Sequence, residues 1–158
     1  MHWFKLAAFV IFCFLALGIL AISLLTPTIA NLKQPKTKKK VFELSCDGVI
    51  AKWMIRNNWG ACTWPLPFIV LIFYWVGDSA SDKLDPYVRV HEFVHVQQDE
   101  ENAFFLVSWV KYIWELFVER RKFGNWMDAY KNNKYESAAY KVEDDYYNGG
   151  KALPDWAA

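Results

Sequence analysis

Hydrophobic residues form one long N-terminal block, followed by shorter segments with strand-like or helix-like spacing. Apart from Lys5 and Ser23, residues 3–25 are apolar, and the run 6–25 contains about twenty residues. A helix of that length can cross a hydrocarbon core of roughly 30 Å. Because the segment is apolar on every side, a membrane span is favoured over a helix packed on a small domain. The pattern therefore predicts a transmembrane anchor over residues 1–26.

A basic linker is expected over residues 27–40. Its lysines are Lys33, Lys36, Lys38, Lys39 and Lys40, whereas Lys5 is the only lysine before the apolar run. Basic residues after a span favour the cytoplasmic side, so we expect a single-pass membrane protein with a cytoplasmic C-terminal domain. The alternative is a secreted protein whose signal peptide is cleaved near the weak small-residue site Thr28-Ile29-Ala30. The apolar run is longer than most signal-peptide cores, which favours the anchor.

Two stretches have the composition of β-strands. Residues 41–46 alternate between apolar and polar side chains and end at Asp47-Gly48, a strong turn signal. Residues 67–76 form a continuous run of β-branched and aromatic residues, which is typical of a buried strand. Such a strand could also offer its edge to an extended peptide. Residues 49–55 fit either a second strand or a helix.

Helices are expected in the second half of the chain. The first spans residues 86–101, because Asp85-Pro86 supplies a favoured N-cap residue and a favoured first helical residue. Residues 103–121 carry a broad apolar face and predict an amphipathic helix packed over the first one. A short helical or irregular piece at 126–130 precedes the last helix, which spans 134–147.

The fold class expected for the chain is α+β and mainly α. At 158 residues, the chain is long enough for one compact domain, over residues 41–150, with an anchor before it and a loose tail over 151–158. The net charge of +1 gives no reason to expect a nucleic-acid partner. Cys46 and Cys62 are expected to be buried thiols in a reducing compartment, or a disulfide pair if the domain faces outward.

The segment His91-Glu92-Phe93-Val94-His95 carries the clearest chemistry. It places the pattern His-Glu-x-x-His on a predicted helix and contains two of the chain's three histidines. Residues four apart in a helix lie about 40° from each other and one turn apart, so His91 and His95 can bind one metal ion together. Glu92 lies beside them, where a carboxylate can take a proton from water activated by the metal. We therefore expect one Zn²⁺ ion, with Glu92 as the general base.

A catalytic zinc ion usually has three protein ligands and a water molecule, so the third ligand here would be a carboxylate, a cysteine or absent. His2 lies beside the apolar N-terminal run and cannot reach the other two histidines. We expect Glu136 as the ligand, because a helical hairpin returns the last helix alongside and Ala138 and Ala139 allow a close approach. The alternative is that Glu136 only stabilises the N-terminus of its helix. Weaker ligand candidates are Asp99, Glu100, Glu101, Glu115 and Glu119.

Taken together, these residues resemble a known family. The pattern His91-Glu92-x-x-His95-x-x-Gln98, followed by an aromatic helix and Tyr135-Glu136-x-x-Ala139-Tyr140, is similar to the small zincin-like metallopeptidases of the glutamate-zincin type in bacteria and phages. The stretch Trp59-Gly60-Ala61-Cys62-Thr63 is also similar to the start of that domain, so the resemblance covers residues 59–147. It implies a zincin-like fold in which His91, His95 and Glu136 hold zinc and Glu92 is the base.

The hypothesis that results is a membrane-anchored, zinc-dependent hydrolase, most simply a metallopeptidase acting on a peptide or protein. Glu92 would deprotonate the attacking water and return the proton to the leaving amine. Tyr130, Tyr135 and Tyr140 are candidates for stabilising the oxyanion, with no order among them. The alternative hypothesis is a non-catalytic, membrane-associated interaction module, in which a metal ion would staple two helices together.

Overall fold

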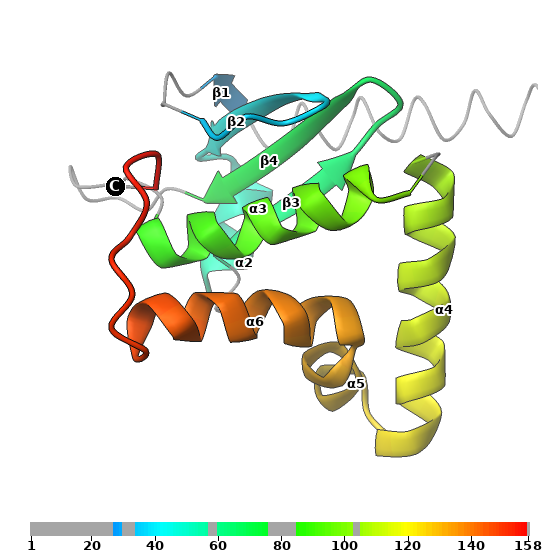
Figure 1. The fold of residues 1–158 in the computed structure, drawn as a ribbon. Helices are drawn as coiled ribbons and strands as arrows, with labels where there is room; N and C mark the ends of the chain where they lie inside the picture. Colours follow the sequence, from blue (N-terminus) through cyan, green and yellow to red (C-terminus); the bar gives the residue numbers. More distant parts are fainter. Residues whose placement is uncertain (1–26, 30–33, 57–59, 76–84, 103–104, 158) are drawn as a thin grey trace, which may run out of the picture.

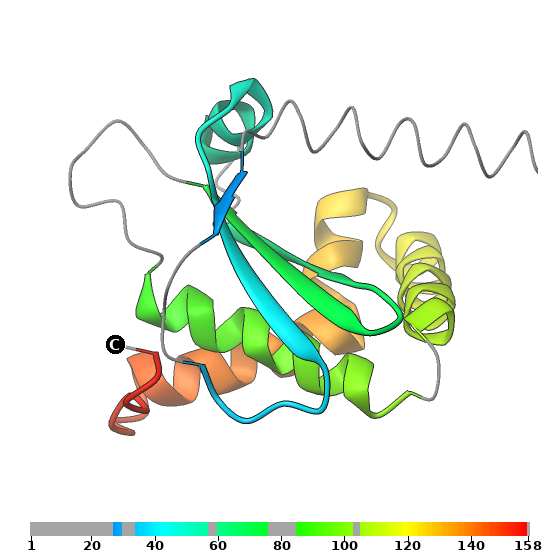
Figure 2. The same cartoon turned by 90° about the horizontal axis from the view of Figure 1, so that it is seen from above.

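The computed structural model describes residues 27–29, 34–56, 60–75, 85–102 and 105–157. In chain order the elements are β1 (Pro27–Ile29), β2 (Lys40–Cys46), α2 (Val49–Arg56), β3 (Ala61–Pro65), β4 (Ile69–Trp75), α3 (Pro86–Glu100), α4 (Phe105–Phe123), α5 (Trp126–Asn132) and α6 (Lys134–Tyr147). The strands form one sheet, α3 lies against it, and α6 lies against α3 on the side away from the sheet (Figure 1). Seen from above, α4 stands at one end of these layers (Figure 2).

The strand order in the sheet is β1-β2-β4-β3. β2 runs parallel to β4, with α2 in the connection between them, whereas β1 and β3 pair antiparallel with their neighbours. The core between the sheet and α3 consists of Val41, Val70, Ile72, Phe93 and Val96. A second core, near α2, consists of Cys46, Ala51 and Phe73. β4 contributes to both cores, because it is an inner strand with apolar side chains on both faces.

The two strands expected from the sequence are confirmed, as β2 and β4. Residues 49–55, which fitted a strand or a helix, lie in α2. β3 was not predicted. It forms a hairpin with β4 through the turn at Leu66, where the backbone N–H donates to the Ile69 carbonyl oxygen at 2.9 Å. That turn contains Pro67, which also marked the start of the predicted strand.

The helices begin and end at residues that are typical of helix caps. The Asp85 side chain accepts hydrogen bonds from the backbone N–H groups of Tyr87 and Val88, which confirms it as the N-cap of α3. Gly124 ends α4 in the left-handed region, at a φ of 77°, where a side chain would be strained. The Asn133 side chain caps α6. In contrast to the prediction, α4 packs mainly against α5 rather than over α3.

The predicted membrane-spanning architecture must be corrected. No helix in the described part of the chain is both long and apolar enough to cross a bilayer. The longest described helix, α4, has 19 residues but carries Lys111 and Glu115 near its middle, and each charge at a bilayer centre costs about 3 kcal/mol. The anchor predicted over 1–26 lies outside the described residues. The described residues therefore form a mainly helical α+β domain that contains no membrane-spanning helix, which overturns the predicted single-pass localisation. The signal peptide of the secreted alternative also lies outside the described residues.

The segments predicted as a linker and a loose tail both contain parts of the folded domain. Residues 27–29 form β1, and Lys39 Nζ lies 2.6 Å from Asp99 Oδ2 on α3. At the other end, the Trp156 ring packs 4.9 Å from the ring of Phe93, which lies in the core beneath the sheet. The tail is therefore attached to α3, contrary to the expectation from its composition.

The tail also covers the most deeply buried ion pair among the described residues. Arg89 Nη2 of α3 lies 2.7 Å from Glu43 Oε1 of β2, and neither side chain is more than 2% exposed. The Arg89 guanidinium also lies over the rings of Phe93 and Trp156. Because an uncompensated buried charge is costly, this pair fixes α3 against the sheet in one position.

Replacing Trp156 with alanine should destabilise the domain. The substitution removes a ring that packs on Phe93 and Arg89, so the free energy of unfolding should fall by about 2 kcal/mol. Urea unfolding followed by circular dichroism measures the change. The matched control is Phe68→Ala in the turn between β3 and β4, where the side chain is 85% exposed and the change should stay within about 0.5 kcal/mol. Equal effects of the two substitutions would contradict the packing role of Trp156.

Candidate metal centre

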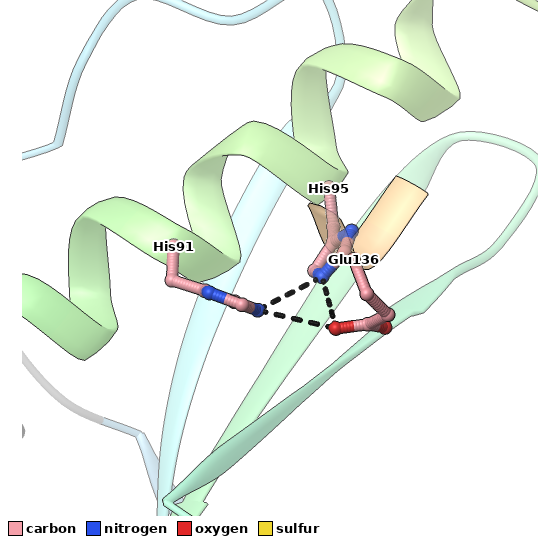
Figure 3. Close-up of side chains that lie close together, drawn as sticks. All are labelled: His91, His95 and Glu136. Atoms are coloured by element: carbon pink, nitrogen blue, oxygen red, sulfur yellow. Dashed lines mark hydrogen bonds and ion pairs between the residues drawn. The ribbon is translucent and has the colours of Figure 1, made fainter. Parts of the chain in front are cut away.

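Three side chains meet between α3 and α6, and they are the three that the sequence singled out. His91 and His95 project from one face of α3, one turn apart, and their Nε2 atoms lie 3.2 Å from each other. Glu136, in the first turn of α6, places Oε2 at 3.4 Å from His91 Nε2 and 3.5 Å from His95 Nε2. Figure 3 shows the three side chains pointing toward one another. The structure therefore brings one imidazole pair and one carboxylate to a common point.

The spacing of these atoms fits a tetrahedral metal ion. Zinc bonds of about 2.05 Å at the tetrahedral angle separate two ligand atoms by roughly 3.3 Å. The observed separations of 3.2, 3.4 and 3.5 Å lie around that value. Glu136 Oε2 is also buried without a hydrogen-bond partner among the described residues, which is costly unless a cation is bound there. The donor set therefore fits one zinc ion with a fourth position for water.

Each histidine is oriented by a hydrogen bond on its other ring nitrogen. His91 Nδ1 lies 2.9 Å from Glu143 Oε2, and His95 Nδ1 lies 2.9 Å from Gln98 Oε1. The Gln98 amide in turn donates to the Tyr135 carbonyl oxygen of α6 at 3.0 Å. Such contacts fix the ring and leave Nε2 to face the metal position. The role of Glu143 was not predicted, although it lies two turns after Glu136 on the same face of α6.

Close packing of α6 against α3 is possible because the side chain between them is small. Ala139 is completely buried, one turn after Glu136. The side chain of Asn133, which caps α6, also donates to the Tyr112 carbonyl oxygen of α4 at 3.3 Å. The N-terminus of α6 is thereby held against α4, and this places Glu136 beside the two histidines.

Glu92 is buried on α3, beside the two histidines. Thr63 Oγ1 of β3 donates a hydrogen bond to Glu92 Oε2 at 2.6 Å, and Glu92 also lines a cleft beside β3. Burial raises the pKa of the Glu92 carboxyl, while His95 and the hydrogen bond from Thr63 lower it by less. A raised pKa suits a group that takes up a proton and returns it. Thr63 was included in the resemblance but had no predicted role.

The metal position opens onto a cleft of about 740 Å³. One wall is β3, the edge strand of the sheet, and the others come from α3, α4, α5 and α6. The apolar part of the lining includes Trp109, Leu116 and Met127. A metal ion held here would be reached from the cleft, as a catalytic metal requires, and would not be closed off by four protein ligands.

Tyrosines surround the Glu136 carboxylate. The Tyr112 hydroxyl, from α4, donates to Glu136 Oε1 at 2.8 Å, a contact that was not predicted. Burial and the neighbouring Glu136 raise the pKa of Tyr112, so that its proton is retained. The three predicted oxyanion candidates, Tyr130, Tyr135 and Tyr140, all line the cleft. The Tyr140 ring also packs against His91 with the centroids 4.6 Å apart.

The weaker ligand candidates are engaged elsewhere or exposed. Asp99 accepts from Lys39, Glu115 lies near Lys134, and Glu119 pairs with Lys122. Glu100 accepts hydrogen bonds from the backbone of Lys38 and Lys39, and Glu101 is exposed. His2 lies outside the described residues.

The two cysteines predicted as thiols or a disulfide are both free. Cys46 is fully buried in the core near α2. Cys62 lines the cleft, where burial and the charges of Glu92 and Glu136 raise its pKa to about 12. Cys62 is therefore a neutral thiol near neutral pH.

The metal position carries excess negative potential. Burial by itself lowers the pKa of His91, but the nearby carboxylates of Glu136 and Glu143 outweigh it and raise the pKa to about 9. The pKa of His95 is also raised, because Glu136 outweighs the effect of burial. The same contacts lower the pKa of Glu136 despite its burial. A positive charge, from protons or from a metal ion, is therefore strongly favoured between α3 and α6.

No protein-family model, curated protein or solved structure matches this chain. The resemblance to zincin-like metallopeptidases therefore stays a prediction. Its support is the geometry of α3 and α6 described above.

Replacing Glu143 with glutamine should weaken zinc binding. The substitution removes the carboxylate that accepts from His91 Nδ1, and loss of such a contact typically lowers metal affinity 10–100-fold. Competition with a chromophoric chelator measures the affinity. The matched control is Asp144→Asn, the same charge change one residue along α6, which should leave the affinity unchanged. An equal loss in both variants would show that only the charge of the helix matters.

Zinc affinity should increase as the pH rises towards 9. A histidine must lose its proton before it binds a metal ion, and the pKa of His91 is raised to about 9. From about pH 6 to about pH 8, we expect the apparent Kd to fall about tenfold per pH unit for each proton displaced. Calorimetry in buffers of different ionisation enthalpy counts the protons released. Binding that is independent of pH and releases no proton would contradict the raised pKa.

Proposed function

We propose that this protein is a zinc-dependent hydrolase, most simply a metallopeptidase. The observation that carries the proposal is the meeting of His91 Nε2, His95 Nε2 and Glu136 Oε2 at tetrahedral spacing, at the edge of an open cleft. Zinc bound there would supply a Lewis acid that activates water and polarises a carbonyl group. His91, His95 and Glu136 would hold it, leaving the fourth position to the cleft.

Glu92 would move the proton. Its Oε2 is held by Thr63, so Oε1 takes the proton from the attacking water and later gives it to the leaving amine. Burial and the raised pKa allow Glu92 to carry this proton without losing it to solvent. Thr63 keeps the carboxylate in position during both transfers.

An extended peptide is the substrate that best fits the cleft. β3 is the edge strand of the described sheet and lines the cleft beside the metal position. A peptide that pairs with an edge strand is held by its backbone, whatever its side chains. The sequence had suggested that residues 67–76 offer this edge. That strand, β4, instead lies between β2 and β3 and has no free edge, so we assign peptide binding to the edge of β3.

The non-catalytic alternative, a metal ion that only joins two helices, has one observation in its favour. The proposed ligands come from α3 and α6, so a bound ion would tie these two helices together. The cleft in front of the metal position argues against it, because structural zinc sites are closed by four protein ligands.

Replacing Glu92 with glutamine should abolish hydrolysis but keep the metal. The amide cannot accept the proton from water, so cleavage of fluorescein-labelled casein should fall by roughly 10²- to 10⁴-fold. Zinc content, measured by atomic absorption, should stay at one ion per chain, because Glu92 is not a proposed ligand. The control Glu101→Gln, an exposed position just after α3, should keep full activity.

Retention of activity by the Glu92 variant would remove this residue from the mechanism. A native protein that holds one zinc ion but leaves casein and unfolded protein substrates intact would favour the non-catalytic alternative.

A further inference from the structure

The outer face of α4 is strongly apolar and exposed. Its exposed side chains are Leu106 (60%), Val107 (39%), Val110 (67%), Ile113 (44%), Trp114 (70%) and Phe117 (55%). At 100° per residue, all of them lie within about 60° of Val110 around the helix. We call this set the α4 stripe. Soluble monomers rarely expose a continuous apolar patch beyond a few hundred Å², so the stripe indicates a binding surface.

The charged residues of α4 that lie nearest to the stripe are basic, and the acidic ones lie farther from it. Lys111 and Lys122 lie roughly 100–120° from Val110 on one side, and Arg120 lies roughly 80° away on the other. Arg121 continues the stripe at its C-terminal end. The two carboxylates, Glu115 and Glu119, lie on the opposite side of the helix and are at most 20% exposed. Because Lys122 is already paired with Glu119, the cations beside the stripe that no described carboxylate pairs with include Lys111 and Arg121.

The position of α4 leaves the stripe accessible. α4 stands across the end of α3 and α6, and its contacts are mainly with α5 (Figure 1). Its inner face supplies Trp109, Tyr112 and Leu116 to the cleft. The helix therefore has one face towards the metal centre, and its outer face is covered by no described element (Figure 2).

We propose that the α4 stripe docks on an anionic lipid surface, with α4 lying flat in the headgroup region. A helix with Trp, Phe and Leu on one face and Lys and Arg beside them has the pattern of an interfacial helix. Tryptophan is favoured at that depth because its ring is apolar and its N–H is polar. Each nearby Lys or Arg adds attraction to acidic headgroups. This mode of binding requires no helix to cross the bilayer.

The charges argue for lipid over a second copy of the chain. If two α4 stripes packed together, Lys111 and Arg121 of both copies would lie at the border of one interface. The two carboxylates of α4 are already engaged within the chain, because Glu119 pairs with Lys122 and Glu115 lies near Lys134. A lipid surface with phosphatidylglycerol supplies the missing negative charge.

A fluorophore at Val110 of the full chain tests this docking. Val110→Cys, in a Cys13→Ser background, is labelled with an environment-sensitive dye. The remaining thiols react little, because Cys46 is buried and the pKa of Cys62 is about 12. Val49→Cys on α2, where the side chain is 77% exposed, is the matched control. Because the dye reports only its own surroundings, lipid binding by the apolar N-terminal residues does not imitate the result.

The dye at position 110 should shift to shorter wavelength with vesicles of phosphatidylcholine and phosphatidylglycerol, and less with phosphatidylcholine alone. The dye at position 49 should not shift. Neutralising Lys111 by Lys111→Gln should raise the lipid concentration at half-shift roughly fivefold, whereas Lys141→Gln on α6 should not change it. No shift at 110, or equal shifts at both positions, would overturn the proposal. So would a shift without vesicles that grows with protein concentration, which would show a second copy on the stripe.

Discussion

The arrangement of the whole domain depends on bringing one carboxylate oxygen against two imidazole nitrogens in a buried position. The three atoms are close enough that their negative potential must be compensated by protons or by a metal ion. This constraint sets the distance between α3 and α6, and it explains why a small residue, Ala139, lies where the helices meet. Glu143 and Gln98 then limit the rotation of each ring.

Charge pairs at both ends of α3 fix the helix against the sheet. Arg89, near the start of α3, pairs with Glu43 of β2, and Asp99, near its end, pairs with Lys39 just before the same strand. Between these two contacts lie His91, Glu92 and His95. The metal centre is therefore carried on a helix held at two points, which suits a site that must keep its geometry within a fraction of an ångström.

Local signals could be read from the sequence, whereas contacts between distant residues could not. Asp85-Pro86 predicted the start of α3, and the spacing of His91 and His95 predicted that they share one face. Glu136 could be proposed because a helical hairpin returns α6 beside α3. Thr63 and Glu143 carry no signal of their own, since their roles depend on which element lies opposite. The packing of Trp156 was missed for the same reason. The membrane-spanning prediction relied on composition alone, and no described helix supports it.

The contact between Trp156 and α3 has a consequence for how the domain folds. β2 comes early in the chain, yet Trp156, which covers the Arg89–Glu43 pair, is synthesised only after the last described helix, α6. A nascent chain must therefore keep this pair partly hydrated until Trp156 has been synthesised and has packed on it. Together with the parallel pairing of β2 and β4, this makes folding depend on contacts between distant parts of the chain, which is slower than the folding of a simple helical bundle.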